Sequence, residues 1–219
     1  MKKSKKYLLK IAIDSPAAAG AGTLAKAISK NYNLFYLDTG KIYRYIAFLK
    51  IKNPKKFNLK FLKSKIKNLN IKKLHIKDLL LDHIGTSASV IAKNTKVRKI
   101  VHNFQIDCAY NPPKRFDGSC LDGRDITYKI VPDANFKFFI TANVKTRATR
   151  RYKELKKLKK KVNFNDVLKS IKKRDKNDFK RKISPLKKTK DSVLINTTNL
   201  SKRACFLKIK KIIDRKLKN

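Results

Sequence analysis

The order of elements near the N-terminus constrains the fold most strongly. Residues 7–13 form an apolar, β-branched run of the kind found in buried strands. A stretch of Ala and Gly follows, after which Leu24, Ala27 and Ile28 recur with the spacing of one helix face. A strand, a small-residue loop and a helix in this order predict the start of a βα unit.

The same alternation continues along the chain. Apolar runs at residues 34–37, 120–121, 136–141 and 193–195 predict further strands. Helices are expected around Tyr43, Ile46 and Ala47 and over residues 87–105, 144–158, 164–180 and 201–218, whereas the Lys- and Leu-rich residues 52–81 have an ambiguous period. Alternating strands and helices predict an α/β fold, with a parallel sheet flanked by helices on both faces.

The composition indicates that the binding partners are anionic but does not identify which kind of anion is bound. The 58 basic and 15 acidic side chains give a net charge of +43, which favours phosphates, nucleic acid or a membrane surface. Lys, Asn, Ile and Phe are abundant while Gly, Pro and Trp are scarce, so a coding sequence biased toward A and T is an alternative explanation for the lysines. Hydrophobic residues make up 42%, enough for a sizeable core.

The cysteines and the N-terminus predict a cytoplasmic protein. Cys108, Cys120 and Cys205 are widely spaced and form no CxxC motif, which disfavours both a disulfide framework and a zinc site. No apolar run approaches the roughly 18 residues of a membrane span. Lys10 and Asp14 interrupt the apolar residues near the N-terminus, so a secretory signal is not expected.

The first loop has the features of a phosphate cradle. Small residues let backbone N–H groups approach an anion, and the N-terminus of a helix lies behind them. The Thr23 hydroxyl, in the first helical turn, is a candidate Mg²⁺ ligand. The loop departs from the usual GxxxxGK[ST] pattern, because Ser15 replaces the first Gly and Ala21 replaces the Lys. A simple turn between a strand and a helix is the alternative.

Two other loops carry residues suited to phosphate. After the second predicted strand, a turn containing Thr39 ends in Gly40, and Arg44 lies one turn into the helix that follows. The Thr39 hydroxyl and the Arg44 guanidinium can then reach one phosphate, with which Arg forms bidentate contacts. Arg124 and Asp125 follow the strand at residues 120–121, and ligands of open α/β sheets bind beyond the carboxyl ends of strands. A helix cap with a surface Arg, and a turn with a local ion pair, are the alternatives.

Six charged residues fall into two groups of three, and helical spacing places each group on one helix face. Arg147, Arg150 and Arg151 share one face, and Arg174, Asp178 and Arg181 share another. The chain has only 11 Arg among its 58 basic residues, so this concentration favours a requirement for planar, forked donors. A solvent-exposed face with weak ion pairs is the alternative.

These motifs together resemble those of bacterial cytidylate kinases. In order, the motifs are DSPAAAGAGTLAKAIS, NLFYLDTGKIYR, LDGRDI, VPDANFKFFITA, RATRRYKEL, RDKNDFKRKISPL and INTTNLS. The resemblance covers nearly the whole chain and is weakest over residues 50–81 and the last helix.

The resemblance implies an enzyme that transfers the terminal phosphate of ATP to CMP or dCMP with Mg²⁺, a monomer without a nucleic-acid or membrane partner. It implies one domain over residues 1–219 with a P-loop kinase core (1–50, 98–143 and 190–219), an insertion that binds the nucleoside monophosphate (about 51–97) and a helical lid (about 144–189).

The resemblance also implies roles for individual residues. The ATP phosphates would bind to Ser15, Pro16, Ala17, Ala18, Ala19, Gly20, Ala21, Gly22 and Thr23. CMP would bind to Thr39, Tyr43, Arg44, Ser89, Arg98, Arg124, Asp125, Arg174, Asp178 and Arg181. The residues that stabilise charge during transfer would be Arg44, Arg124, Arg150, Arg151 and Arg181.

The departures from the family pattern leave alternatives open. Family members normally read GPAGSGKGT where this chain reads SPAAAGAGT, so the P-loop lysine is replaced by Ala21. Either another cation compensates, with Lys26 as one possibility, or the chain binds nucleotides with little kinase activity. Asn177 and Ile106 stand where the family commonly has Arg. The net charge alone motivates a third hypothesis, a nucleic-acid-binding protein.

Overall fold

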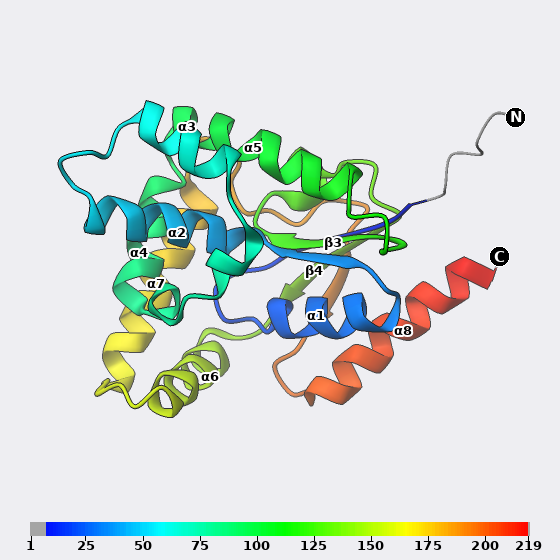
Figure 1. The fold of residues 1–219 in the computed structure, drawn as a ribbon. Helices are drawn as coiled ribbons and strands as arrows, with labels where there is room; N and C mark the ends of the chain where they lie inside the picture. Colours follow the sequence, from blue (N-terminus) through cyan, green and yellow to red (C-terminus); the bar gives the residue numbers. More distant parts are fainter. Residues whose placement is uncertain (1–7, 219) are drawn as a thin grey trace, which may run out of the picture.

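The computed structural model describes residues 8–218 and has a parallel sheet between two layers of helices (Figure 1). The spatial order of the strands is β2-β3-β1-β4-β5, and all the pairings are parallel. This arrangement confirms the predicted α/β class, although Tyr7 of the first expected strand lies outside the described residues, as do the two ends of the predicted domain. The strands are β1 (Leu9–Asp14), β2 (Phe35–Asp38), β3 (Gly118–Gly123), β4 (Phe136–Thr141) and β5 (Val193–Asn196).

Helices connect the strands. Two of the connections are long helical segments that extend from the sheet, and they are called the first and the second excursion below. One excursion lies between β2 and β3 and the other between β4 and β5. The helices are α1 (Ala21–Asn31), α2 (Thr39–Lys52), α3 (Leu59–Lys67), α4 (Asp82–Ile91), α5 (Thr95–Tyr110), α6 (Val144–Lys157), α7 (Phe164–Lys180) and α8 (Lys202–Lys218).

The two faces of the sheet are buried against different helices because successive side chains of a strand point to opposite sides. Ile11 and Ile13 of β1 pack in one apolar cluster with α1 and α8. Ala12, between them, belongs to a second cluster with α2, α5 and the helices of the first excursion. Figure 1 shows these two helix layers on either side of the sheet, with α6 and α7 standing at one end.

The prediction of one continuous helix over residues 87–105 is wrong, because parts of two helices occupy this segment. α4 ends at Ile91 and α5 begins at Thr95. Asn94 lies between them with an extended backbone, and its side-chain oxygen accepts a hydrogen bond from the N–H of Val97 (3.1 Å). An Asn that caps a new helix competes with continuation of the previous one, which explains the break.

The segment of ambiguous period, residues 52–81, packs onto α2. It forms α3 and two short 3₁₀ turns, Ile71–His75 and Lys77–Leu80. Leu62 and Leu79 are fully buried in the cluster that contains α2. Short turns give too few periods for a helix pattern to be visible in the sequence.

Gly118 is required where β1 and β3 approach each other. A Cβ at this position would lie 1.9 Å from the carbonyl oxygen of Leu9. We expect Gly118→Ala to lower the free energy of unfolding by about 3 kcal/mol, since two paired strand backbones would have to separate. Urea denaturation measures the effect. Ser119→Ala, which removes a hydrogen bond to the carbonyl of Ala109 (2.7 Å), should cost only about 1 kcal/mol and serves as the comparison. Equal stability of the Gly118→Ala variant and the parent would contradict the expectation.

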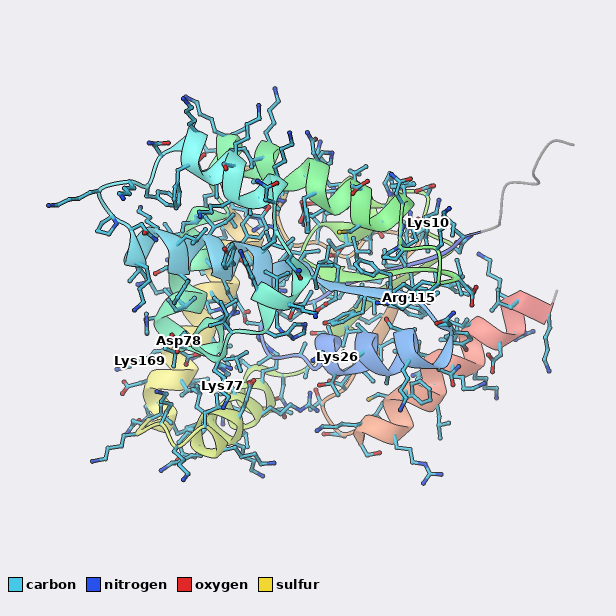
Figure 2. The ribbon with its side chains drawn as sticks, viewed as in Figure 1. Lys10, Lys26, Lys77, Asp78, Arg115 and Lys169 are labelled. Carbon is cyan, nitrogen blue, oxygen red and sulfur yellow. The ribbon has the colours of Figure 1, made fainter. Side chains whose placement is uncertain are left out.

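Basic side chains are spread over the surface. Figure 2 shows nitrogen-tipped side chains projecting around most of the outline of the molecule, from helices of both layers. Among the described residues, no helix is both long enough and apolar enough to cross a bilayer.

Candidate functional site

The candidate site lies at the edge of the sheet where the parallel strands end. β1 ends at Asp14, β2 ends at Asp38, and Asp38 pairs in register with Asp122 of β3. A loop connects β1 to α1, α2 follows β2 directly, and residues 124–125 follow β3. Carboxyl ends of parallel strands are the usual place for ligands in open α/β sheets.

The Asp14 side chain connects the end of β1 to the segment that follows β3. Its two carboxylate oxygens accept hydrogen bonds from the backbone N–H groups of Ile126 (2.8 Å) and Thr127 (3.0 Å) and from the Thr127 hydroxyl (2.6 Å). The side chain is fully buried, and burial raises its pKa to about 6, while the hydrogen bonds act in the opposite direction. Asp14 therefore positions the segment after β3 and is not open to a ligand.

Side chains from other parts of the chain donate hydrogen bonds to carbonyl groups of the small-residue loop between β1 and α1. The carbonyl of Ala17 accepts a hydrogen bond from Arg147 (3.0 Å), and that of Ala19 accepts one from the Thr197 hydroxyl (3.0 Å). Gly20, before α1, has a φ of 93°, a left-handed conformation that glycine adopts without steric cost. The first N–H groups of α1 have no partner within the helix, so the loop and the helix together can cradle an anion.

A large cavity of about 890 Å³ opens in front of this loop. The predicted loop residues line it except Ala17, which is buried. Thr23 lines the same cavity and is exposed. The volume is within the roughly 300–1,000 Å³ of small-molecule sites. The cavity also contains five lysines: Lys26, Lys41, Lys153, Lys157 and Lys202.

A second, smaller cavity contains every residue predicted from the sequence for the acceptor nucleotide. Its volume is about 60 Å³, and its wall includes several arginines. One of them, Arg44, donates to the carbonyls of Leu79 and Leu81. The predicted residues in its wall are Thr39, Tyr43, Arg44, Ser89, Arg98, Arg124, Asp125, Arg174, Asp178 and Arg181.

Acidic side chains hold several of these arginines. Arg124 Nε donates to Asp178 Oδ2 (2.7 Å), and Arg98 forms a buried ion pair with Asp125. The hydroxyl of Thr39 donates to the carbonyl of Asp122 (2.8 Å), which fixes the start of α2 against β3. Buried guanidinium groups held in this way keep one orientation.

Other donors in the smaller cavity remain unsatisfied. Tyr43 OH, Arg174 Nε and Arg181 Nη2 are buried and have no hydrogen-bond partner within the described residues. Burial, with neighbouring arginines, lowers the pKa of both Arg44 and Arg174. Crowded cations and unpaired buried donors both cost free energy, and an anion in the cavity would offset both costs.

The two cavities share a wall. Gly40, Arg44, Arg124 and Arg174 line both of them. A group bound in one cavity therefore lies beside a group bound in the other, with guanidinium groups at the boundary.

The arginines of α6 reach different partners, although the sequence places them on one face. Arg147 forms an ion pair with Asp175 of α7 (2.7 Å) and supports the loop through Ala17. Arg150 donates to the carbonyl of Thr197 (2.6 Å) and lies beside the loop at Ala19. Arg151 pairs with Asp82 of α4 (2.8 Å), and both Arg150 and Arg151 line the large cavity.

A pair of carboxylates beside the loop was missed in the sequence. Burial and the nearby Asp38 both raise the pKa of Asp122, while the Tyr36 hydroxyl, which donates to Asp122 (2.8 Å), lowers it. Two crowded carboxylates next to a phosphate cradle suit Mg²⁺, which binds through one or two carboxylates plus phosphate oxygens. The described residues contain no group of three His, Cys, Asp or Glu side chains able to hold a metal by themselves. Aspartates at the ends of adjacent strands were the available sequence signal.

Comparison with known proteins agrees with this geometry. The model of the cytidylate kinase family matches residues 11–215. Similar proteins include the cytidylate kinase of Bartonella tribocorum (41% identity, 90% of each chain), that of Clostridium botulinum strain Okra (38%, 94% of this chain and 98% of the relative) and that of Mesomycoplasma hyopneumoniae strain 7448 (36%, 95% of each).

One solved structure shares the fold. The crystal structure of an uncharacterized protein from Eubacterium ventriosum aligns with a TM-score of 0.55 at 16% identity and covers 94% of this chain and 98% of its own. The family match extends over nearly all the elements that build the two cavities. The chain therefore belongs to the cytidylate kinase family.

Proposed function

We propose that the protein transfers the γ-phosphate of ATP to CMP or dCMP, giving ADP and CDP or dCDP. The observation that carries the proposal is the wall shared by the two cavities, which is built from Arg44, Arg124 and Arg174. A donor phosphate chain on one side and an acceptor phosphate on the other would meet at these guanidinium groups.

The smaller cavity would receive the nucleoside monophosphate. Arg44, Arg124 and Arg181 would bind its phosphate, and the unpaired donors of Tyr43 and Arg181 support an anionic ligand there. Ser89, Arg98 and Asp125 would recognise the base, and Arg174 and Asp178 would position the ribose and phosphate, as the family resemblance implies. Arg98 and Asp125 hold each other in place, so their orientation would be set before binding.

The large cavity would receive ATP. The loop from Ser15 to Thr23 would hold the phosphates by its backbone N–H groups, and Arg150 and Arg151 would neutralise charge on the transferred group. Thr23, with Asp38 and Asp122, would hold Mg²⁺ beside the phosphates. When bound, this ion would neutralise phosphate charge.

The reaction needs positioning and charge neutralisation from the protein. A bond forms between an acceptor phosphate oxygen and the γ-phosphorus, and the bond from that phosphorus to the bridging oxygen of ADP breaks. The transition state spreads negative charge over the transferred group, which the fixed guanidinium groups between the cavities stabilise.

The first excursion and the α6–α7 region would move to admit substrates. A cavity of about 60 Å³ is well below the roughly 300–1,000 Å³ of ligand sites, so the acceptor requires an opening. Arg151 bridges to Asp82, and Lys93 of the first excursion donates to Asn177 of α7 (2.8 Å). These contacts support the division into a core, an insertion over about 51–97 and a lid over about 144–189, which closes to exclude water.

A nucleotide-binding protein with little kinase activity is the second candidate, because Ala21 occupies the position of the P-loop lysine. A coupled ADP-release assay with ATP, Mg²⁺ and a panel of CMP, dCMP, UMP and AMP separates the two. We expect turnover that depends on CMP or dCMP. Binding of CMP by calorimetry without turnover would favour the second candidate, and absence of both would refute the proposal.

We also propose a monomer that acts in the cytoplasm. The three cysteines are free and buried, and burial raises the pKa of the Cys108 and Cys120 thiols to about 12, which suits a reducing compartment. Sedimentation of the purified protein tests the oligomeric state.

A further inference from the structure

The replacement of the P-loop lysine leaves the donor cavity without a cation at its usual place. Ala21, in the first turn of α1, is buried and carries no charge. If the chain is an efficient kinase, some other cation must act on the donor phosphates. The lysines that line the cavity are Lys26, Lys41, Lys153, Lys157 and Lys202.

Burial separates Lys41 from the other four lysines. Lys26, Lys153, Lys157 and Lys202 are exposed, whereas Lys41 is partly buried. Lys26, the candidate from the sequence, lies on α1 beyond the first turn, where an ammonium extended into water loses most of its effect by screening. A partly buried ammonium acts through a lower effective dielectric and is worth more to a phosphate.

The surroundings of Lys41 bring it to the loop. The backbone N–H of Lys41 donates to Asp38 (3.1 Å), and Asp38 pairs in register with Asp122, so Lys41 lies close to the end of β3. The positive charge of Lys41 also opposes the rise in the pKa of Asp122. Asp122 in turn lies against α1, since a Cβ on Gly22 would be 3.7 Å from Asp122 Oδ2. Gly22 is the residue after Ala21. Lys41 and Ala21 both line the large cavity, so Lys41 presents its charge from α2 to the cavity that a lysine at position 21 would reach from α1.

The position of Lys41 within its own helix is unfavourable by itself. It lies in the first turn of α2, whose N-terminus carries partial positive charge, and that turn contains no acidic residue. Asp38 caps the helix by accepting a hydrogen bond from the backbone N–H of Lys41 (3.1 Å), which involves no side-chain charge of Lys41. A cation at this place therefore lowers the stability of the helix by itself, and an anion outside the helix would offset that cost.

We propose that the ammonium of Lys41 replaces the missing P-loop lysine and neutralises the donor phosphates from the N-terminus of α2. This inference rests on the proposed function. Lys41 forms no covalent bond and transfers no proton; it supplies positive charge where negative charge develops during transfer.

Four variants test this role. Lys41→Met removes the charge at similar length, and we expect kcat to fall about 100-fold, with the KM for CMP changed by less than about threefold. Ala21→Lys in the Lys41→Met background should recover at least about tenfold, because it returns a charge to the same cavity. Lys50→Met, on the exposed end of α2, is the matched control, and Lys26→Met tests the competing lysine.

A second readout does not depend on turnover. Calorimetry with ADP and Mg²⁺ should show affinity weakened about tenfold by Lys41→Met and unchanged by Lys50→Met. A merely structural role for Lys41 would instead raise the KM for CMP, since Tyr43 and Arg44 lie on the same helix.

Each outcome of these experiments either supports or contradicts the proposed role of Lys41. Loss of kcat in Lys41→Met with rescue by Ala21→Lys supports the proposal. Retention of kcat in Lys41→Met, a loss on Lys26→Met alone, or a failure of Ala21→Lys to rescue would overturn it while leaving the kinase assignment intact. If the parent protein shows no turnover, the proposed function fails, and the ADP affinities still decide whether Lys41 contacts the donor phosphates.

Discussion

Arg124→Met should lower kcat/KM for CMP by roughly 10³–10⁴-fold, because it removes a charged donor from the wall between the cavities and leaves a buried carboxylate behind. Arg124 lines both cavities, and its Nε donates to Asp178 (2.7 Å). Removing the guanidinium deprives the acceptor phosphate of a partner. Among residues 8–218, Asp178 then keeps only the longer ion pair to Arg181 (3.8 Å).

Initial-rate kinetics with CMP and ATP varied separately measure this effect. Arg115→Met is the control, since Arg115 is exposed, stacks over the ring of Phe116 and lines neither cavity. Arg124→Lys should lie between the two, because an ammonium keeps the charge and loses the forked geometry. A change of less than about tenfold in Arg124→Met would show that the wall between the cavities does not bind the reacting groups.

Asp14→Ala should lower the free energy of unfolding by about 4 kcal/mol, because it leaves three buried donors without an acceptor. The lost hydrogen bonds come from the backbone N–H groups of Ile126 and Thr127 and from the Thr127 hydroxyl. Thr127→Val, which removes only the hydroxyl, should cost about 1 kcal/mol. Urea denaturation at fixed pH measures both, and similar costs for the two variants would contradict this account.

The pH dependence gives an independent check on Asp14. Its pKa rises from 3.8 to about 6 on folding, chiefly through burial. The native state then binds the proton more tightly than the unfolded state between these values. The contribution of Asp14 to stability should therefore fall as the pH rises from about 4 to about 6 and stay constant above that. The stability difference between the parent and Asp14→Ala should be larger at pH 4.5 than at pH 6.5, and the opposite trend would refute the assigned shift.

Local patterns predicted the core of the fold well. The strand expected over residues 136–141 and the helix over 164–180 have the observed bounds, because each has a clear period and a polar boundary. The break at Asn94 was missed, since an Asn within an otherwise helical run signals a cap only when the next turn is known. Residues 52–81 gave no pattern because their turns are short and stabilised by packing on α2.

The complete set of residues that line the smaller cavity could be predicted only through the family motifs. Helix periodicity placed Arg174, Asp178 and Arg181 on one face, and all three line one cavity. The helical placement of Arg181 is wrong, because α7 ends at Lys180 and the backbone of Arg181 is extended. By contrast, Asp38 and Asp122 became neighbours only through the pairing of β2 with β3, which the sequence does not state. The position of Lys41 beside Asp122 depends on the same register. Contacts between distant segments are set by topology, and local sequence rules do not contain them.

The basic side chains that project around most of the outline of the molecule have a kinetic consequence. A net charge of +43 accelerates encounters with polyanions, and this acceleration depends on ionic strength. In the proposed function, the choice among nucleotides depends instead on a few enclosed arginines whose partners are fixed by short-range geometry. Salt should therefore slow the arrival of substrates while leaving the ranking of one nucleotide over another almost unaltered.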